Sequence, residues 1–111
     1  MFKIDDLKKN HGTLHIICGP MFSGKTEELI KRLKRSEIAQ LKTIAFKHKL
    51  DDRMTIEYIN SHSGEKFKAI ALENADDIKL FISQDTNVIG IDEIQFFNTN
   101  IIKIILCFLF Q

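Results

Sequence analysis

The sequence predicts an α/β fold in which a mainly parallel sheet is flanked by helices. Two observations support this class. Short segments rich in β-branched residues alternate with segments of helical periodicity, in the order strand, helix, strand, helix, strand. The last strand is continuously apolar and ends on an acidic pair, a pattern typical of a parallel strand covered on both faces. Because the chain has 111 residues and no linker-like composition, we expect a single domain over residues 1–111.

The amino-terminal part is predicted to form a strand, a glycine-rich loop and a helix. The segment TLHIIC, residues 13–18, favours a strand and stops at a Gly-Pro pair that indicates a tight loop. A helix is predicted from Lys25 to about Gln40, with acidic residues at its positive end. Its apolar stripe consists of Leu29, Ile30 and Leu33.

The rest of the chain is predicted to form four further strands, two of them paired in a hairpin, and a short helix. Residues 42–48 form the next strand candidate, and residues 55–60 and 66–72 form a β-hairpin through the turn SHSGE. Asn74 is a candidate cap for a short helix. The apolar strand covers residues 87–92. The predicted fold is thus a parallel sheet with flanking helices and a β-hairpin insertion.

Composition and charge give no indication of a nucleic-acid or membrane partner. Lys and Arg number 16 and Asp and Glu 15, so the net charge of +1 gives no reason to expect nucleic acid or a membrane surface as a partner. The first residues lack a secretory signal, and we expect a cytoplasmic chain. Cys18 and Cys107 form no C-x-x-C pair, so zinc is not expected and both are predicted to be small buried side chains.

The loop over residues 19–26, GPMFSGKT, fits the pattern G-x-x-x-x-G-K-[ST] between a strand and a helix. In this P-loop, glycines let backbone N–H groups surround phosphate oxygens at the helix N-terminus. Lys25 would reach the β- and γ-phosphates of ATP, and the Thr26 hydroxyl would bind Mg²⁺. The alternative is a tight turn, which would not need both of these residues. The predicted nucleotide-binding residues here are Gly19, Pro20, Met21, Phe22, Ser23, Gly24, Lys25 and Thr26.

A second part of such a site is predicted at the end of the apolar strand. Asp92 would hold Mg²⁺ directly or through water, and Glu93 could accept a proton from an attacking hydroxyl or water. Taken alone, an acid in this position is usually a strand-end or cap residue. Together with Lys25 and Thr26, the pair predicts a P-loop NTPase type of sheet.

The sequence segments around these motifs are more specific to one protein family than the motifs themselves. The segments GTLHIICGPMFSGKTEELIKRL and VIGIDEIQFF resemble the thymidine kinase family of the cellular and bacterial P-loop type. FKHKLDDR is similar to the F-K-P-x-x-D-x-R segment of that family, and SHSG to its S-H-x-G turn. The resemblance covers residues 12–98.

The resemblance implies roles for these residues. Lys25 and Thr26 would serve the ATP phosphates and Mg²⁺, and Asp92 the metal. Glu93 would be the catalytic base that accepts the 5′-hydroxyl proton of thymidine during transfer of the γ-phosphate. Gln95 belongs to the same segment, VIGIDEIQFF, and is predicted to take part in nucleotide binding.

Further positions follow from the same resemblance. Asp51 and Arg53 match the D-x-R pair, which implies a place near the phosphates. Met21 and Phe96 match positions that line the pocket for the base, with plain core packing as the alternative for each. His62 matches the turn histidine and is expected at the surface.

The chain also departs from the family pattern. His48 stands where the family has proline, and Met54 stands where an aromatic residue is usual. The family continues beyond Asn98 into a zinc-bearing lobe with a loop that holds the thymine, and its members are homotetramers. We therefore expect a chain that is incomplete at the C-terminus, with a weakened thymidine site. The apolar segment 101–111 is expected to be either a buried helix or out-of-frame sequence.

Three functions remain open at this stage. The first is thymidine kinase activity, with impaired transfer to thymidine. The second is a P-loop ATPase or switch module that ignores thymidine. The third is a non-catalytic nucleotide-binding remnant or one half of a split kinase, which the lack of any C-x-x-C pair favours.

Overall fold

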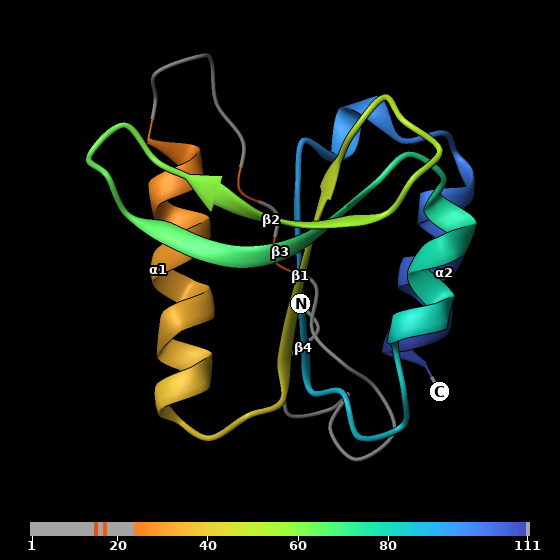
Figure 1. Ribbon diagram of the computed structural model, residues 1–111. Helices are drawn as coiled ribbons and strands as arrows, with labels where there is room; N and C mark the ends of the chain where they lie inside the picture. Colours follow the sequence, from red (N-terminus) through yellow and green to blue (C-terminus); the bar gives the residue numbers. More distant parts are fainter. Residues whose placement is uncertain (1–14, 16, 18–23, 111) are drawn as a thin grey trace.

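A computed structural model of the chain describes His15, Ile17 and residues 24–110 (Figure 1). The elements are helix α1 (Lys25–Ile38), strands β1 (Thr43–His48), β2 (Thr55–Asn60) and β3 (Lys66–Leu72), the 3-10 helix η2 (Ala75–Phe81), strand β4 (Val88–Asp92), the 3-10 helix η3 (Ile94–Phe96) and helix α2 (Asn100–Leu109). The predicted strand over residues 13–18 lies mostly outside the described residues and stays a prediction.

The four strands form one open sheet in the order β2-β3-β1-β4. Strand β1 runs parallel to both of its neighbours, β3 and β4. Strands β2 and β3 are antiparallel over six residue pairs, from Thr55↔Ala71 to Asn60↔Lys66. The predicted α/β class and the hairpin are therefore confirmed. The hairpin is part of the sheet itself, so the described sheet is mixed rather than purely parallel.

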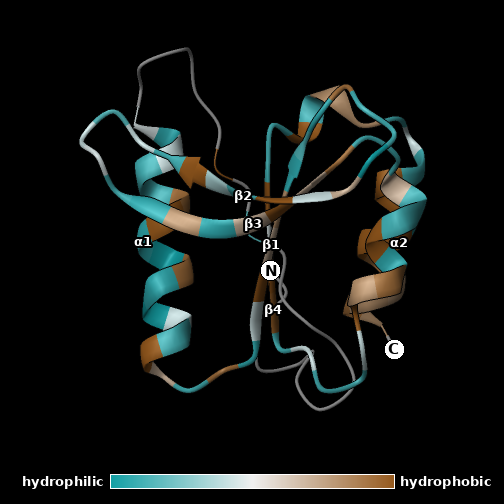
Figure 2. Ribbon diagram, in the orientation of Figure 1, coloured by the Kyte–Doolittle hydropathy of each residue, from teal (hydrophilic) through white to brown (hydrophobic). Residues whose placement is uncertain are grey.

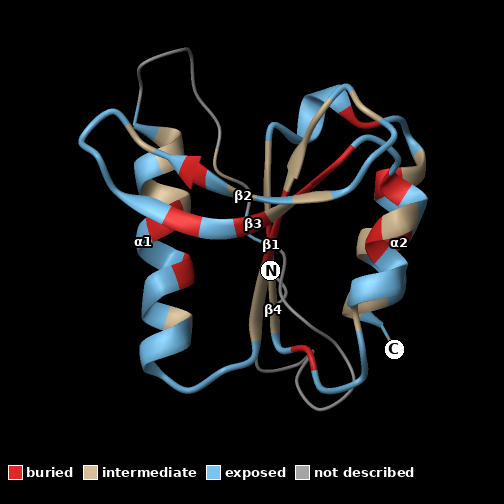
Figure 3. Cartoon of the chain, in the orientation of Figure 1, coloured by how far each residue is buried: buried red, intermediate tan, exposed pale blue. Residues whose placement is uncertain are grey.

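Helices cover both faces of the sheet. Helix α1 lies on one face, and η2 and α2 lie on the other (Figure 1). The core on the α1 face consists of Ile30, Leu33, Ala45, Ile59, Phe67 and Ala69. The core on the α2 face consists of Phe46, Leu72, Ala75, Ile78, Phe97, Ile101 and Ile104. Figure 3 shows the buried segments on the strands and on those parts of the helices that are turned toward the sheet.

Helix α1 follows the predicted pattern. Ile30 and Leu33 are buried, while the Lys and Arg residues between and after them are exposed, and the helix is largely hydrophilic in Figure 2. Its close approach to β4 depends on Gly90, because a Cβ atom there would lie 2.6 Å from Leu33 Cδ2. The helix ends in two backbone hydrogen bonds, from Gln40 N–H to the Glu37 carbonyl at 2.9 Å and from Leu41 N–H to the Ser36 carbonyl at 3.0 Å. This pattern places Gln40 at a φ of 63°.

The short helix after β3 is present, as a 3-10 helix. The side chain of Asn74 accepts a hydrogen bond from the backbone N–H of Asp76 at 3.0 Å, so the predicted cap is confirmed. Ile78 is buried, and the ring of Phe81 lies 6.1 Å from that of Phe46.

The apolar tail forms helix α2, so the prediction of a buried helix is confirmed for part of its surface. Ile101 and Ile104 are buried, whereas the opposite side of the helix is exposed at Ile102 and Leu106. Cys107 is exposed as well, so the prediction of a buried cysteine is wrong there, because residue 107 lies off the inner face of the helix. Within residues 24–110, none of the helices combines the length and the apolar character needed to span a membrane.

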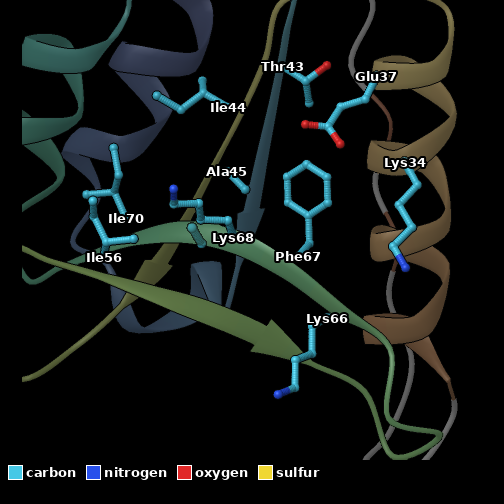
Figure 4. A pocket seen from close by; sticks show the side chains of 11 residues that line it. Lys34, Glu37, Thr43, Ile44, Ala45, Ile56, Lys66, Phe67, Lys68 and Ile70 are labelled. Carbon is cyan, nitrogen blue, oxygen red and sulfur yellow. The ribbon is translucent and has the colours of Figure 1, made fainter.

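Strands β1 and β3 pair only over their last residues, from Phe46↔Ile70 to His48↔Leu72. Their first halves diverge because the hairpin twists away from β1. A cavity of about 420 Å³ opens between them, with Phe67 pointing toward α1 and Ile44 and Ile70 on the other side (Figure 4). This cavity lies at the amino end of the parallel strands, away from the acidic pair.

Candidate functional site

Three elements meet at one edge of the sheet. Strands β1 and β4 are parallel and both end there, and α1 begins there, at the top of Figure 1. Lys25 is the first residue of α1 and Asp92 is the last residue of β4. A cavity of about 900 Å³ beside β4 is lined by both of them, by Glu93 and Gln95, and by His15 and Ile17. The structure thus brings together four residues that the sequence placed in one site.

Helix α1 begins directly after Gly24, whose backbone allows a sharp turn into the helix. Gly24 has a φ of 82°, which glycine adopts without strain, and its carbonyl accepts the N–H of Glu28 at 3.0 Å. Lys25 and Thr26 follow in the first turn and are half-buried. Residues 19–23, and with them the predicted roles of Gly19, Pro20, Met21, Phe22 and Ser23, lie outside the described residues.

Asp92 is a carboxylate in a poorly solvated place. Burial raises the pKa of Asp92, and the neighbouring charge of Glu93 raises it further. The backbone N–H of Glu93 and the positive charges of Lys47 and Lys25 act in the opposite direction. A carboxylate that water solvates poorly gains more from a nearby cation than an exposed one does.

Glu93 adopts a backbone conformation that is unusual for a residue with a side chain. Its φ and ψ are 58° and 39°, in the left-handed region. Such a conformation costs about 1 kcal/mol or more and persists only where the surrounding structure requires it, often at functional sites. Gln95 Nε2 donates a hydrogen bond to Glu93 Oε2 at 2.9 Å, which holds the exposed carboxylate at the edge of the cavity. Gln95 therefore acts on Glu93 directly.

Phe96 lies at the surface beside this turn. It is 61% exposed, so core packing is excluded as its role, whereas the adjacent Phe97 is buried. The ring of Phe96 stacks on His48 at 5.8 Å, and the ring of Phe97 meets His48 edge-on at 4.9 Å. His48, the residue that replaces the proline of the family, thus links the end of β1 to η3.

Asp51 and Arg53 pair with each other in the loop after β1. The Asp51 carboxylate accepts the backbone N–H of Arg53 at 3.0 Å and its guanidinium at 3.3 Å. The backbone N–H of Arg53, followed by its side chain, lowers the pKa of Asp51. Neither residue lines the cavity that Lys25 and Asp92 share, so the structure does not bring the pair to that site. His62 is exposed in the hairpin turn, as predicted.

The donor groups at this edge suit a hard cation. The Asp92 carboxylate offers oxygen, and Mg²⁺ is typically bound by one or two such protein groups together with substrate phosphates. Thr26, in the first turn of α1, does not line the cavity that Asp92 lines. A cluster of three or more His, Cys, Asp or Glu side chains that could hold a metal alone is not found within residues 24–110, His15 and Ile17. A magnesium ion held by Thr26 and Asp92 therefore stays a prediction.

One polar residue of this edge was not predicted from the sequence. Lys47 is the register partner of Asp92 across the β1–β4 pair, so the two side chains lie on the same face of the sheet. The alternation of strand residues was visible in the sequence, but the pairing register that sets Lys47 beside Asp92 was not.

These features define an α/β protein with a polar site at the carboxyl edge of an open sheet, where a helix begins after a glycine. The model of the thymidine kinase family matches residues 12–107 of the chain. The chain belongs to the thymidine kinase family, and the resemblance is confirmed. It is therefore a member of a kinase family.

Proposed function

We propose that the site binds MgATP and that the chain's chemistry is transfer of the γ-phosphate to the 5′-hydroxyl of thymidine, which gives dTMP and ADP. The observation that carries the proposal is the meeting of Lys25, Asp92 and Glu93 around one cavity in a chain of this family. Small molecules, ATP and thymidine, are the proposed partners, and the predicted cytoplasmic location agrees with them.

Each residue has a separate task in the proposed reaction. Lys25 binds oxygens of the β- and γ-phosphates, while the loop over residues 19–24 supplies backbone N–H groups. Mg²⁺, held by Thr26 and Asp92, would add positive charge against the phosphate oxygens. The 5′-oxygen of thymidine attacks the γ-phosphorus as the bond to ADP breaks, and Glu93 accepts the hydroxyl proton.

The geometry of the acidic turn supports the assignment of the base. Because the left-handed backbone of Glu93 turns the chain directly after β4, Glu93 lies beside Asp92 but outside the strand. The Gln95 amide holds one carboxylate oxygen and leaves the other for a proton. Phe96, which is exposed three residues after Glu93, offers an aromatic surface for the base of a nucleoside.

The first experiment measures γ-phosphate transfer to thymidine with wild type and Glu93→Gln. We expect the variant to lose about 10²-fold or more in rate, the usual contribution of a positioned general base, while its MgATP affinity stays near wild type. Glu37→Gln, an exposed acid in the last turns of α1, is the matched control and should behave as wild type. Equal transfer rates in wild type and Glu93→Gln would remove Glu93 from the mechanism.

The same measurements separate the alternatives. ATP hydrolysis that is indifferent to thymidine would favour an ATPase or switch module. Binding of MgATP that Lys25→Ala abolishes, without any transfer, would favour the nucleotide-binding remnant or half of a split kinase, in agreement with the prediction of a weakened thymidine site.

A further inference from the structure

We propose that Lys47 is a further phosphate-binding residue of this site, a second cation that binds the phosphate chain of the nucleotide from β1. The inference rests on the proposed function. Lys47 does not line the cavity that Lys25 and Asp92 share, so phosphate binding requires its side chain to leave its contacts with β2 and turn toward Asp92.

The placement of Lys47 follows from the register of two strand pairs. It is the partner of Asp92 on β4 and of Ala71 on β3, so these three side chains share the α1 face at the carboxyl edge. Lys25 begins α1 on that same face and edge.

The ammonium group of Lys47 is held on the hairpin by weak contacts. Lys47 Nζ donates to the Tyr58 carbonyl at 3.1 Å and lies 3.7 Å from Glu57 Oε1. Because these groups belong to β2, the stem of Lys47 crosses β3, where the small side chain of Ala71 leaves it room. A partly exposed ion pair of this kind contributes about 1 kcal/mol at most, so a phosphate could replace it.

Lys47 shares its carboxylate partner, Glu57, with a second lysine. Lys49 Nζ lies nearer to Glu57, 3.1 Å from Oε2, and also donates to Thr55 Oγ1 at 2.9 Å. The hydrogen bond from Thr55 and then the one from Lys49 are the largest causes that lower the pKa of Glu57. The ammonium groups of Lys47 and Lys49 therefore share the Glu57 carboxylate, which lies nearer to Lys49. Lys47 lies on the face that carries Asp92 and the start of α1, and its ammonium group is held on the hairpin by the shared carboxylate and one backbone carbonyl.

Lys49 supplies a matched control. It is a lysine at the same end of β1, its side chain is 25% exposed like that of Lys47, and it contacts the same carboxylate. Only Lys47 is paired with Asp92 in the sheet. A role confined to anchoring the hairpin would make the two lysines equivalent, whereas a phosphate-binding role would not.

The test is a titration of the purified full chain with MgATP, MgADP and AMP. The proteins are wild type, Lys25→Ala, Lys47→Met, Lys49→Met and Glu57→Gln. We expect Lys47→Met to weaken MgATP binding about tenfold, equivalent to about 1.4 kcal/mol. Its effect on AMP should be much smaller, because fewer phosphates remain. Lys49→Met should change each affinity less than about twofold, and Glu57→Gln should not weaken MgATP binding, since it releases Lys47.

Thermal unfolding without ligand checks that each variant is folded, and Lys47→Gln replaces Lys47→Met if the latter is not. Equal losses in Lys47→Met and Lys49→Met, or equal losses for MgATP and AMP, would overturn the role of Lys47 while the proposed function stands. If wild type binds no MgATP, or if Lys25→Ala binds it as well as wild type, the proposed function fails and the role of Lys47 fails with it.

Discussion

The two faces of the sheet differ most at its carboxyl edge. Along β1 and β4, alternate residues point to opposite faces. The α2 face carries Ile44, Phe46, Ile89 and Ile91, and all four pack into or against one apolar core. The other alternate residues, on the α1 face, are Thr43, Ala45, Lys47, Val88, Gly90 and Asp92.

This difference separates stability from chemistry within a single sheet. The α2 face carries large apolar side chains on β1 and β4, of which Phe46 is fully buried and the isoleucines are partly buried, and β1 ends on this face with His48. The α1 face has small residues in its middle, which admit α1 at close range, and charged residues at its end. Because the charged groups on that face are only partly buried, their interactions stabilise the folded chain little, and they are suited to bind a ligand. Changes on the two faces should therefore have different consequences.

The largest expected effect is on the α2 face. Phe46→Ala removes a fully buried ring at the centre of that core and should lower the free energy of unfolding by about 3–5 kcal/mol. Ala45→Gly, the neighbouring residue on the opposite face, should cost only about 1 kcal/mol. Denaturant unfolding followed by circular dichroism measures both. Similar losses in the two variants would mean that the faces do not differ in this way.

A smaller loss is expected where α1 approaches β4. Gly90→Ala places a methyl group against Leu33 Cδ2 and should cost about 1–3 kcal/mol in unfolding free energy. The combination of Gly90→Ala with Leu33→Ala should cost less than the sum of the single changes, because the smaller side chain removes the clash. Strict additivity in this double-mutant cycle would show that α1 moves aside instead.

The two left-handed residues provide a third comparison. Gln40→Gly and Glu93→Gly should each raise the free energy of unfolding by about 0.5–1 kcal/mol, because glycine relieves the strain at positive φ. Only Glu93→Gly should abolish phosphate transfer, since Gln40 lies at the far end of α1. Thermal unfolding and the transfer assay measure the two properties. A Glu93→Gly variant that is less stable than wild type would indicate that the carboxylate itself holds the turn.

The smallest effect concerns Asp92 and its dependence on pH. Because its pKa is raised in the folded chain, the folded state binds the proton more tightly than the unfolded state does, and stability is lost as pH rises through this range. Asp92→Asn should therefore be more stable than wild type at neutral pH, and the gain should vanish in acid. Thermal unfolding at several pH values measures the difference.

Asp51→Asn is the control of opposite sign. Its pKa is lowered, first by the backbone N–H of Arg53, so its ionised form stabilises the folded chain above the ordinary pKa of an aspartate and the contribution is lost in acid. Asp51→Asn should therefore be slightly less stable than wild type at neutral pH. A pH profile with the same sign for both variants would contradict the assigned environments.

Local patterns predicted much of the fold. Helix α1, the hairpin, the cap at Asn74 and the strand that ends at Asp92 were all anticipated, because helical periodicity, turn residues and capping act between neighbours in the chain. The pairing of β3 with β1 was not anticipated, since register between distant strands depends on which surfaces pack together. The exposure of Cys107 and of one side of α2 was missed for the same reason.

The candidate site also has some features that follow from the sequence and others that depend on the tertiary structure. The sequence by itself determined the chemical groups, namely the lysine and threonine after the glycines and the acidic pair after an apolar strand, because motif spacing is local. The tertiary structure alone decided that Arg53 turns back to Asp51, that Phe96 stacks on His48, and that Lys47 stands beside Asp92. Those relations depend on strand register and on side-chain packing across the sheet, which join residues that are distant in the chain.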